Sequence, residues 1–151
     1  MIPDLVNLTG APWKVLPPNI HQASLREVEQ SFATNPHRRG LFQGLVEALR
    51  ALSVAGCRYV FLDGSYVTGK PKPGDYDACW NPTGVDVKLL DPVFLDFKNK
   101  RANQKAKYKG EFFPFHLDAG NGQAFIDFFQ TESFTGKQKG IVLIDLSQES
   151  F

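Results

Sequence analysis

Two aspartates, Asp75 and Asp77, stand one residue apart at the start of a segment that ends in the apolar run Ala78-Cys79-Trp80. In an extended strand alternate side chains point to the same face, so both carboxylates can lie together while Tyr76 and Ala78 point the other way. Magnesium in proteins takes one or two carboxylates and completes its coordination with water and substrate phosphates. The spacing therefore predicts a site for Mg²⁺ or Mn²⁺ held by Asp75 and Asp77.

A second group of residues, upstream of the aspartates, is typical of phosphate binding. The apolar run at 59–62 predicts a buried strand and is followed after one residue by Gly64-Ser65. Glycine lets a phosphate approach the backbone closely, and a helical turn starting at Ser65 would present free N–H groups to it. Lys70 and Lys72 follow in the same loop and can offset the charge of a triphosphate. Both halves are expected to converge on one polyanion.

The order of these residues resembles the signature of the nucleotidyltransferase superfamily that includes DNA polymerase β. That signature is an apolar strand, Gly-Ser, a spacer of about ten residues and Asp-x-Asp, here Gly64, Ser65, Asp75 and Asp77. Further segments resemble an uncharacterised small bacterial family within that superfamily: residues 17–21, 35–39, 111–114 and 128–130. The resemblance implies a minimal nucleotidyltransferase fold of the α+β class, with a small mixed sheet flanked by helices on one side.

The resemblance also implies an activity, in which a nucleoside monophosphate moves from a nucleoside triphosphate such as ATP to a hydroxyl acceptor. A third acid on a neighbouring strand would act as the general base. Glu111 is the first candidate, with Asp127, Asp118 and Asp145 behind it. The acceptor could be an RNA end, a protein or a small molecule. Small members of the superfamily often act with a helical partner protein or as homodimers, some in toxin–antitoxin or defence contexts.

Other interpretations of the same residues stay open. Asp75-Tyr76-Asp77 after Pro73-Gly74 could be a polar hairpin entry with two solvated carboxylates. The fold could also serve as a catalytically silent nucleotide- or protein-binding module, such as an antitoxin. Residues 98–109 carry six positive charges and no acid, which fits either contact with nucleic-acid phosphates or a solvated helical face. Arg38 and Arg39 are expected in a first helical turn, where the helix dipole disfavours cations, so a contact with a substrate phosphate or a partner's acid, or plain exposure, would explain them.

Length and composition indicate one domain. The 151 residues are 42% hydrophobic and 22% charged, enough to bury a single core. Residues 1–23 contain four prolines and are expected to form an extended arm, with residues 24–151 as the nucleotidyltransferase-like domain. No segment approaches the roughly 18 apolar residues of a membrane span, and the amino terminus lacks a basic leader, which predicts a cytoplasmic protein without membrane contact. Cys57 and Cys79 are expected to be buried and unpaired.

The expected elements follow from caps and periodicity. A capping box of Ser24 and Glu27 begins a helix, and Asn35-Pro36 begins a longer one that ends at Gly56. Leucines at helical spacing predict its buried face: Leu41, Leu45, Leu49 and Leu52. Further elements are expected as a strand through Asp75 and Asp77, a helical region from Asp91-Pro92, a strand over 111–116, a short helix over 122–131 and a strand over 140–146.

Overall fold

The computed structural model describes residues 1–115 and 127–151, which contain a five-stranded mixed sheet of order β1-β5-β2-β3-β4. Its strands are β1 (Ile20–Gln22), β2 (Tyr59–Asp63), β3 (Tyr76–Trp80), β4 (Gly110–Pro114) and β5 (Ile141–Asp145). Strand β2 is antiparallel to β3 and to β5, whereas β3 with β4 and β1 with β5 are parallel. The helices are α1 (Leu25–Phe32), α2 (Pro36–Val54) and α3 (Lys98–Tyr108). The expected α+β class is confirmed.

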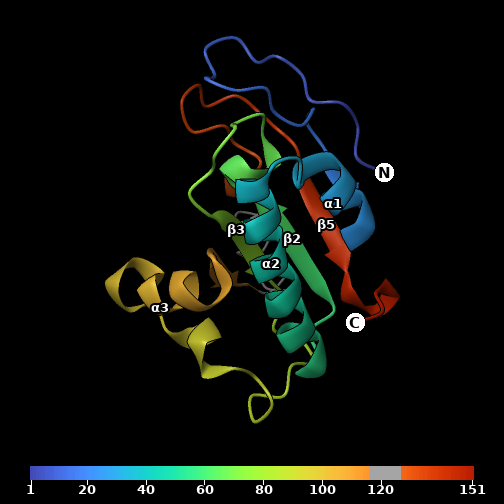
Figure 1. Ribbon diagram of the computed structural model, residues 1–151, viewed down its shortest axis with the longest axis vertical. Coiled ribbons are helices and arrows are strands. Elements are labelled where there is room, and N and C mark those ends of the chain that lie inside the picture. The colour runs from blue at the N-terminus through green and yellow to red at the C-terminus, as the bar shows by residue number, and fades with distance from the viewer. Residues whose placement is uncertain (116–126) are drawn as a thin grey trace.

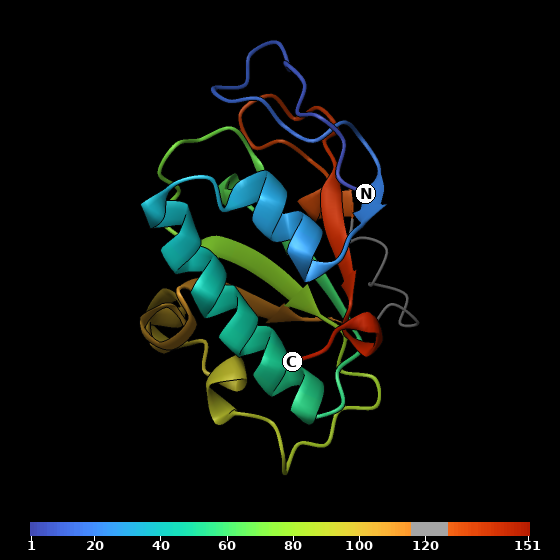
Figure 2. The same cartoon turned by 45° about the vertical axis from the view of Figure 1, so that its right-hand side comes forward.

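Helices α1 and α2 lie against one face of the sheet, and α3 lies near the β4 edge (Figures 1 and 2). Alternation along β3 separates the two faces. Tyr76, Ala78 and Trp80 are buried in the core that α1 and α2 cover, whereas Cys79 belongs to a smaller apolar cluster with Phe61. Asp77 therefore points away from the helices, as the spacing of the two aspartates predicts.

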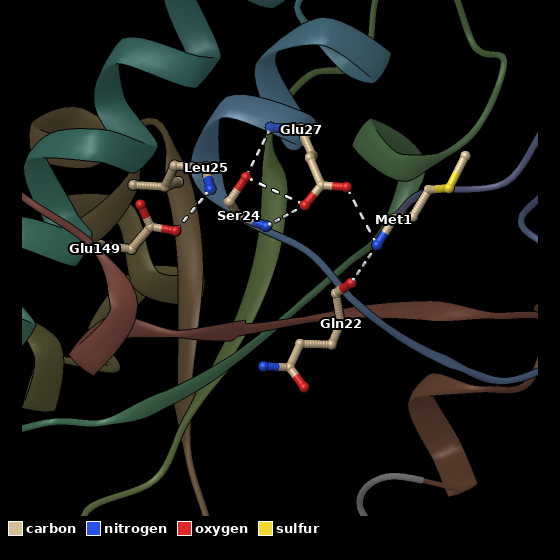
Figure 3. Close-up of polar contacts among 6 residues, drawn as sticks. All are labelled: Met1, Gln22, Ser24, Leu25, Glu27 and Glu149. Carbon is tan, nitrogen blue, oxygen red and sulfur yellow. Dashed lines mark hydrogen bonds and ion pairs between the residues drawn. The ribbon is translucent and has the colours of Figure 1, made fainter.

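The capping box at the start of α1 is confirmed (Figure 3). The Ser24 side chain accepts from the backbone N–H of Glu27, and the Glu27 carboxylate accepts from that of Ser24. The amino group of Met1 lies 3.2 Å from the same carboxylate. Glu149 accepts from the backbone N–H of Leu25, so residues near both ends of the chain meet at this helix start. Together these contacts satisfy N–H groups that a helix terminus leaves without partners.

Helix α2 has the expected start and the expected buried face. Asn35 accepts from the N–H of Arg38 as the N-cap, and Pro36 is the first helical residue. The four periodic leucines are all buried. The helix ends at Val54, two residues before Gly56.

Alanine at two glycine positions of α2 is expected to change the stability of the protein in opposite directions. A Cβ at Gly44 would lie 2.3 Å from the Tyr108 carbonyl oxygen, whereas a Cβ at Gly40 would meet nothing within 4 Å. We expect Gly44→Ala to destabilise the protein by about 1–3 kcal/mol through overpacking. Gly40→Ala should stabilise it by about 0.4–1 kcal/mol, because alanine reduces the entropy of the unfolded chain. Thermal unfolding of both variants tests this, and a stabilising Gly44→Ala would contradict the close contact between α2 and the end of α3.

The amino-terminal arm packs onto the body, and it ends in a short strand that the expectation of an extended arm did not include. Val15 and Leu16 are buried, and Val6 forms an isolated antiparallel bridge with Val15. Ile20–Gln22 forms the edge strand β1, which pairs with β5. A three-residue strand is too short to show a periodic pattern, so its hydrogen-bonding partner rather than its own sequence determines the conformation.

The region around α3 only partly follows the expectation. A 3₁₀ turn at Pro92–Leu95 precedes α3, whose residues Asn99–Arg101 have left-handed backbone angles. The buried side chain of Gln104 ties α3 to its neighbours, donating to the Val93 carbonyl and accepting from the Phe112 N–H. Of the three remaining predicted elements, the strand expected over 111–116 is found as Gly110–Pro114 and the strand expected over 140–146 as Ile141–Asp145. Residues 127–129 of the expected short helix are helical. His116 and residues 122–126 lie outside the described residues.

Two expectations about the chain as a whole can be compared with the structure. Cys57 and Cys79 are both buried and unpaired, as expected. Burial raises the pKa of the Cys57 thiol to about 12, which makes it a poor nucleophile. Among the described residues, no helix combines the length and apolar character needed to cross a membrane.

Candidate functional site

Carboxylates from three adjacent strands lie in one row at the edge of the face that the helices leave open. Asp63 on β2 is directly opposite Asp77 on β3, and Asp77 is directly opposite Glu111 on β4. Residues paired in register share a face of the sheet. Asp75 comes just before β3, on the same side as Asp77 by the two-residue period. The structure thus brings Asp75, Asp77 and Glu111 to one region and adds Asp63 to them.

The crowding of these acids shifts their protonation equilibria. Burial, followed by the charges of Asp75, Asp63 and Glu111, raises the pKa of Asp77 to about 7. Burial and the Glu111 charge also raise the pKa of Asp75 above its usual value, although Lys105 and Lys70 oppose this. Negative charge at Asp77 is therefore costly in the metal-free protein, and a cation bound here would relieve that cost.

Gly64 brings the Gly-Ser turn directly against Asp77. Its φ is +84°, in the region that favours glycine, and a Cβ there would lie 2.8 Å from Oδ2 of Asp77. Ser65–Val67 then form a single 3₁₀ turn, with the N–H of Val67 bonded to the Gly64 carbonyl. The two halves of the predicted site, separated by about ten residues in sequence, are adjacent in the fold.

Three lysines serve the site in different ways. Lys139, just before β5, forms a buried ion pair with Asp63. Lys105 on α3 lies 2.7 Å from Glu111 and 3.9 Å from Asp75, which gives one residue of the basic stretch a defined place at the site. Lys70 lines the cavity described below, as expected of a phosphate ligand, whereas Lys72 is exposed and does not line it.

The start of α2 holds the loop that carries Lys70. Arg38 is buried, and its guanidinium donates to the carbonyls of four residues: Phe32, Tyr66, Thr68 and Lys70. Asn35 donates to the Pro71 carbonyl, and Nε2 of His37 donates to that of Pro73. Plain exposure does not hold for Arg38, because its guanidinium is buried against carbonyls of the chain itself, and these carbonyls account for its place in the first helical turn. Arg39 is exposed.

A cavity of about 650 Å³ opens beside the Gly-Ser turn and Asp77. Its volume is typical of sites that bind small molecules. One part of its wall is polar and contains Asp63, Gly64, Ser65, Lys70, Asp77 and Lys139. Another part is contributed by the arm and by residues 128–136, and includes Trp13, Phe128 and Phe134. The predicted phosphate half and one of the predicted metal ligands therefore face one hollow.

Asp75 and Asp77 are the residues that could hold a divalent cation, since their carboxylates are hard oxygen donors on one side of β3. Within residues 1–115 and 127–151, no three His, Cys, Asp or Glu side chains are placed closely enough to form a complete metal site. Two carboxylates suffice for Mg²⁺ when phosphate oxygens and water fill the other positions. The donor set fits a cation that is shared with a phosphate ligand.

Asp145 and Asp127 are the other described candidates for the third acid, and both lie outside the row of Asp63, Asp77 and Glu111. Asp145 sits at the end of β5 opposite Tyr59, the residue of β2 farthest from Asp63. There it pairs with Arg58 and caps a 3₁₀ turn, so its role is structural. Asp127 lines a neighbouring hollow with Asn19 and Gln130, and Thr131 and Lys139 line both this hollow and the cavity. Asp118 lies outside the described residues.

Residues 11–145 match a protein family, DUF6932, whose description is a family of unknown function. The chain belongs to DUF6932. The match spans the arm from Ala11, the Gly-Ser turn, all the clustered carboxylates and Lys139. No curated protein and no solved structure matches this DUF6932 chain.

Sequence reasoning missed two members of the site in this DUF6932 chain. Asp63 could have been noticed in the sequence, because it ends the apolar strand and its side chain lies on the same face as that of Phe61. The same pattern is equally typical of a carboxylate that only ends a strand. No sequence pattern indicates that Lys139 belongs to the site, since it lies 76 positions from Asp63. Only the antiparallel pairing of β2 with β5 brings the two residues together.

Proposed function

We propose that this protein is a metal-dependent nucleotidyltransferase that moves a nucleoside monophosphate from a nucleoside triphosphate to a hydroxyl acceptor. The observation that supports this most is that Gly64-Ser65, Asp77 and Lys70 line a single cavity, with Asp75 and Glu111 beside Asp77. Phosphate-binding and cation-binding groups in one hollow are what a nucleoside triphosphate with Mg²⁺ requires. The resemblance of these residues to the nucleotidyltransferase superfamily points to the same chemistry.

In the proposed reaction, the acceptor hydroxyl oxygen forms a bond to the α-phosphorus of the nucleotide. The bond from that phosphorus to the oxygen bridging the α- and β-phosphates breaks, and pyrophosphate leaves with the electron pair. Glu111, in register with Asp77, takes the hydroxyl proton as general base. Lys70 offsets the charge that develops on pyrophosphate. Mg²⁺ held by Asp75 and Asp77, when bound, would supply electrostatic stabilisation of the phosphate oxygens.

One observation favours a second candidate, a silent nucleotide-binding module. Lys105 is ion-paired with Glu111 and lies close to Asp75, so the proposed general base already has a cationic partner. A site retained for binding alone tolerates such a pairing, whereas a catalytic site must release or exploit it. Both candidate functions use the same cavity to bind a nucleotide, and they differ in whether the protein catalyses transfer.

Transfer of label separates these candidates. The protein is incubated with each of four α-³²P-labelled nucleoside triphosphates, Mg²⁺ or Mn²⁺ and whole-cell extract, and RNA, protein and small molecules are resolved separately. Label transferred by the wild type and absent with the Asp75→Asn/Asp77→Asn variant would establish the enzyme and identify the acceptor class. Magnesium-dependent nucleotide binding without transfer would support the silent module and direct the search to a protein partner.

A further inference from the structure

Three aromatic side chains that line the cavity are unusually accessible for residues of their size. Trp13 is 40% exposed, Phe128 72% and Phe134 75%. They come from the arm, from the short helical segment at 127–129 and from the turn that follows it. All three line the same cavity as Gly64, Ser65 and Lys70. Exposed aromatic groups gathered in a hollow are characteristic of a binding surface.

Specific contacts keep these aromatic residues in place. The arm is fixed beside the phosphate half because the N–H of Gly69 donates to the Lys14 carbonyl, next to Trp13. Phe128 packs edge-to-face on the buried Phe129, with ring centroids 5.3 Å apart. The N–H of Phe134 donates to the carboxylate of Glu132, itself buried. Each ring therefore lies on a segment that makes defined contacts within the chain.

The two loops that carry Trp13 and Phe134 also support each other. The arm and the segment after residue 131 lie side by side at one end of the molecule in both views (Figures 1 and 2). Nζ of Lys137 donates to the Thr9 carbonyl at 3.4 Å, and a Cβ at Gly10 would come within 3.0 Å of the Thr135 side chain. Both loops contribute residues to the lining of the cavity.

We propose that Trp13, Phe128 and Phe134, here called the aromatic wall, bind the base of a nucleoside triphosphate whose phosphates lie at Gly64-Ser65. This inference rests on the proposed function and extends it to the recognition of the nucleoside. Stacking of a base on an aromatic side chain strengthens binding by about five- to 140-fold and tolerates any base, with larger ring systems stacking more strongly. The wall therefore favours purine over pyrimidine nucleotides modestly and does not select one base strictly.

Comparison of MgATP with magnesium tripolyphosphate tests the wall separately from the phosphate site. By calorimetry we expect the wild type to bind MgATP at least about tenfold more tightly than magnesium tripolyphosphate. This difference in affinity corresponds to one stacked base. The Trp13→Ala/Phe128→Ala variant should lose most of that advantage while its tripolyphosphate affinity stays unchanged. Phe134→Ala should show a smaller loss of the same kind. Phe151→Ala removes an aromatic ring of 43% exposure outside the cavity and should change neither affinity.

Tryptophan fluorescence provides an independent readout. Of the two tryptophans, Trp13 lines the cavity and Trp80 is buried in the core. MgATP should quench the emission of the wild type, and Trp13→Phe should abolish the quenching with little loss of affinity. Equal affinity for MgATP and tripolyphosphate, or aromatic variants that weaken both ligands equally, would overturn the aromatic wall alone. If neither ligand binds in the presence of Mg²⁺, the proposed function fails as well.

Discussion

Asp77→Asn is expected to reduce nucleotidyl transfer by at least about a hundredfold and, at the same time, to stabilise the metal-free protein at pH 8. The first effect follows because an amide cannot replace the anionic ligand or its charge, and losing one such electrostatic group costs about 10²–10³ or more in rate. The second follows because Asp77 is crowded by Asp75, Asp63 and Glu111. Asparagine has nearly the same shape and carries no charge, so it removes that repulsion without opening a cavity.

The pH dependence of the stability change has a definite sign. Asp77 has a usual pKa of 3.8, and in the folded protein it is raised to about 7. A raised carboxyl pKa means that the fold binds the proton more tightly than the unfolded chain does, so this residue costs stability increasingly as the pH rises from about 4 to about 7. The full difference corresponds to at most about 4 kcal/mol at about 1.4 kcal/mol per pH unit. In EDTA, the gain from Asp77→Asn should therefore be largest near pH 8 and vanish below about pH 4.

Thermal unfolding in EDTA at several pH values, combined with the transfer assay, checks both effects. A gain of roughly 2 kcal/mol would raise the melting temperature by about 4–8 °C for a chain of this size. Added Mg²⁺ should stabilise the wild type and leave Asp77→Asn unaffected, because binding to the folded state alone raises stability. The control is Asp145→Asn at the far end of β2 and β5, where Arg58 and Ser147 lower the carboxyl pKa despite burial, so this variant should lose stability at pH 8. An Asp77→Asn protein that is less stable and fully active would show that Asp77 is a structural carboxylate.

The parts of this fold that could be predicted from the sequence are those determined by neighbours along the chain. The capping box at Ser24, the Asn35-Pro36 helix start and the leucine face of α2 depend on contacts within one or two helical turns. The common face of Asp75 and Asp77 likewise follows from the geometry of a single strand. Strand β1 could not be found in this way, because three residues with no period of their own take their conformation from β5.

The candidate site shows the same division. Gly64 and Asp77 belong to one turn and one strand pair, and their approach is implied by the hairpin-like order of β2 and β3. Lys139 and Trp13 reach the cavity only through long-range packing of β5 and of the arm. Arg38 is the clearest case of a local rule pointing to the wrong explanation. Its unfavourable place in a first helical turn correctly indicates a special requirement, but the requirement is the loop of the chain itself.

Arg38→Ala is expected to destabilise the protein by about 3 kcal/mol and to lower its melting temperature by roughly 6–12 °C. The guanidinium supplies hydrogen bonds to four carbonyls, and without it the carbonyls of Phe32 and Tyr66 would lose a buried donor. Hydrogen bonds to charged groups contribute about 1.5–3 kcal/mol each, and water entering the space would recover part of the loss. Arg38→Lys should restore little, because a single ammonium group cannot span the carbonyls that the planar guanidinium reaches.

The same substitution should affect ligand binding in a way that reveals what the arginine holds. With the carbonyls of Thr68 and Lys70 released, the loop that carries the Lys70 ammonium group becomes mobile, so MgATP and magnesium tripolyphosphate should both bind more weakly by a similar factor. Variants of the aromatic wall, by contrast, should weaken MgATP alone. Arg39→Ala, at the neighbouring exposed arginine, is the matched control and should change neither the melting temperature nor either affinity. An Arg38→Ala protein with unaltered stability but lost binding would instead mean that the guanidinium leaves its carbonyl partners to contact the phosphates.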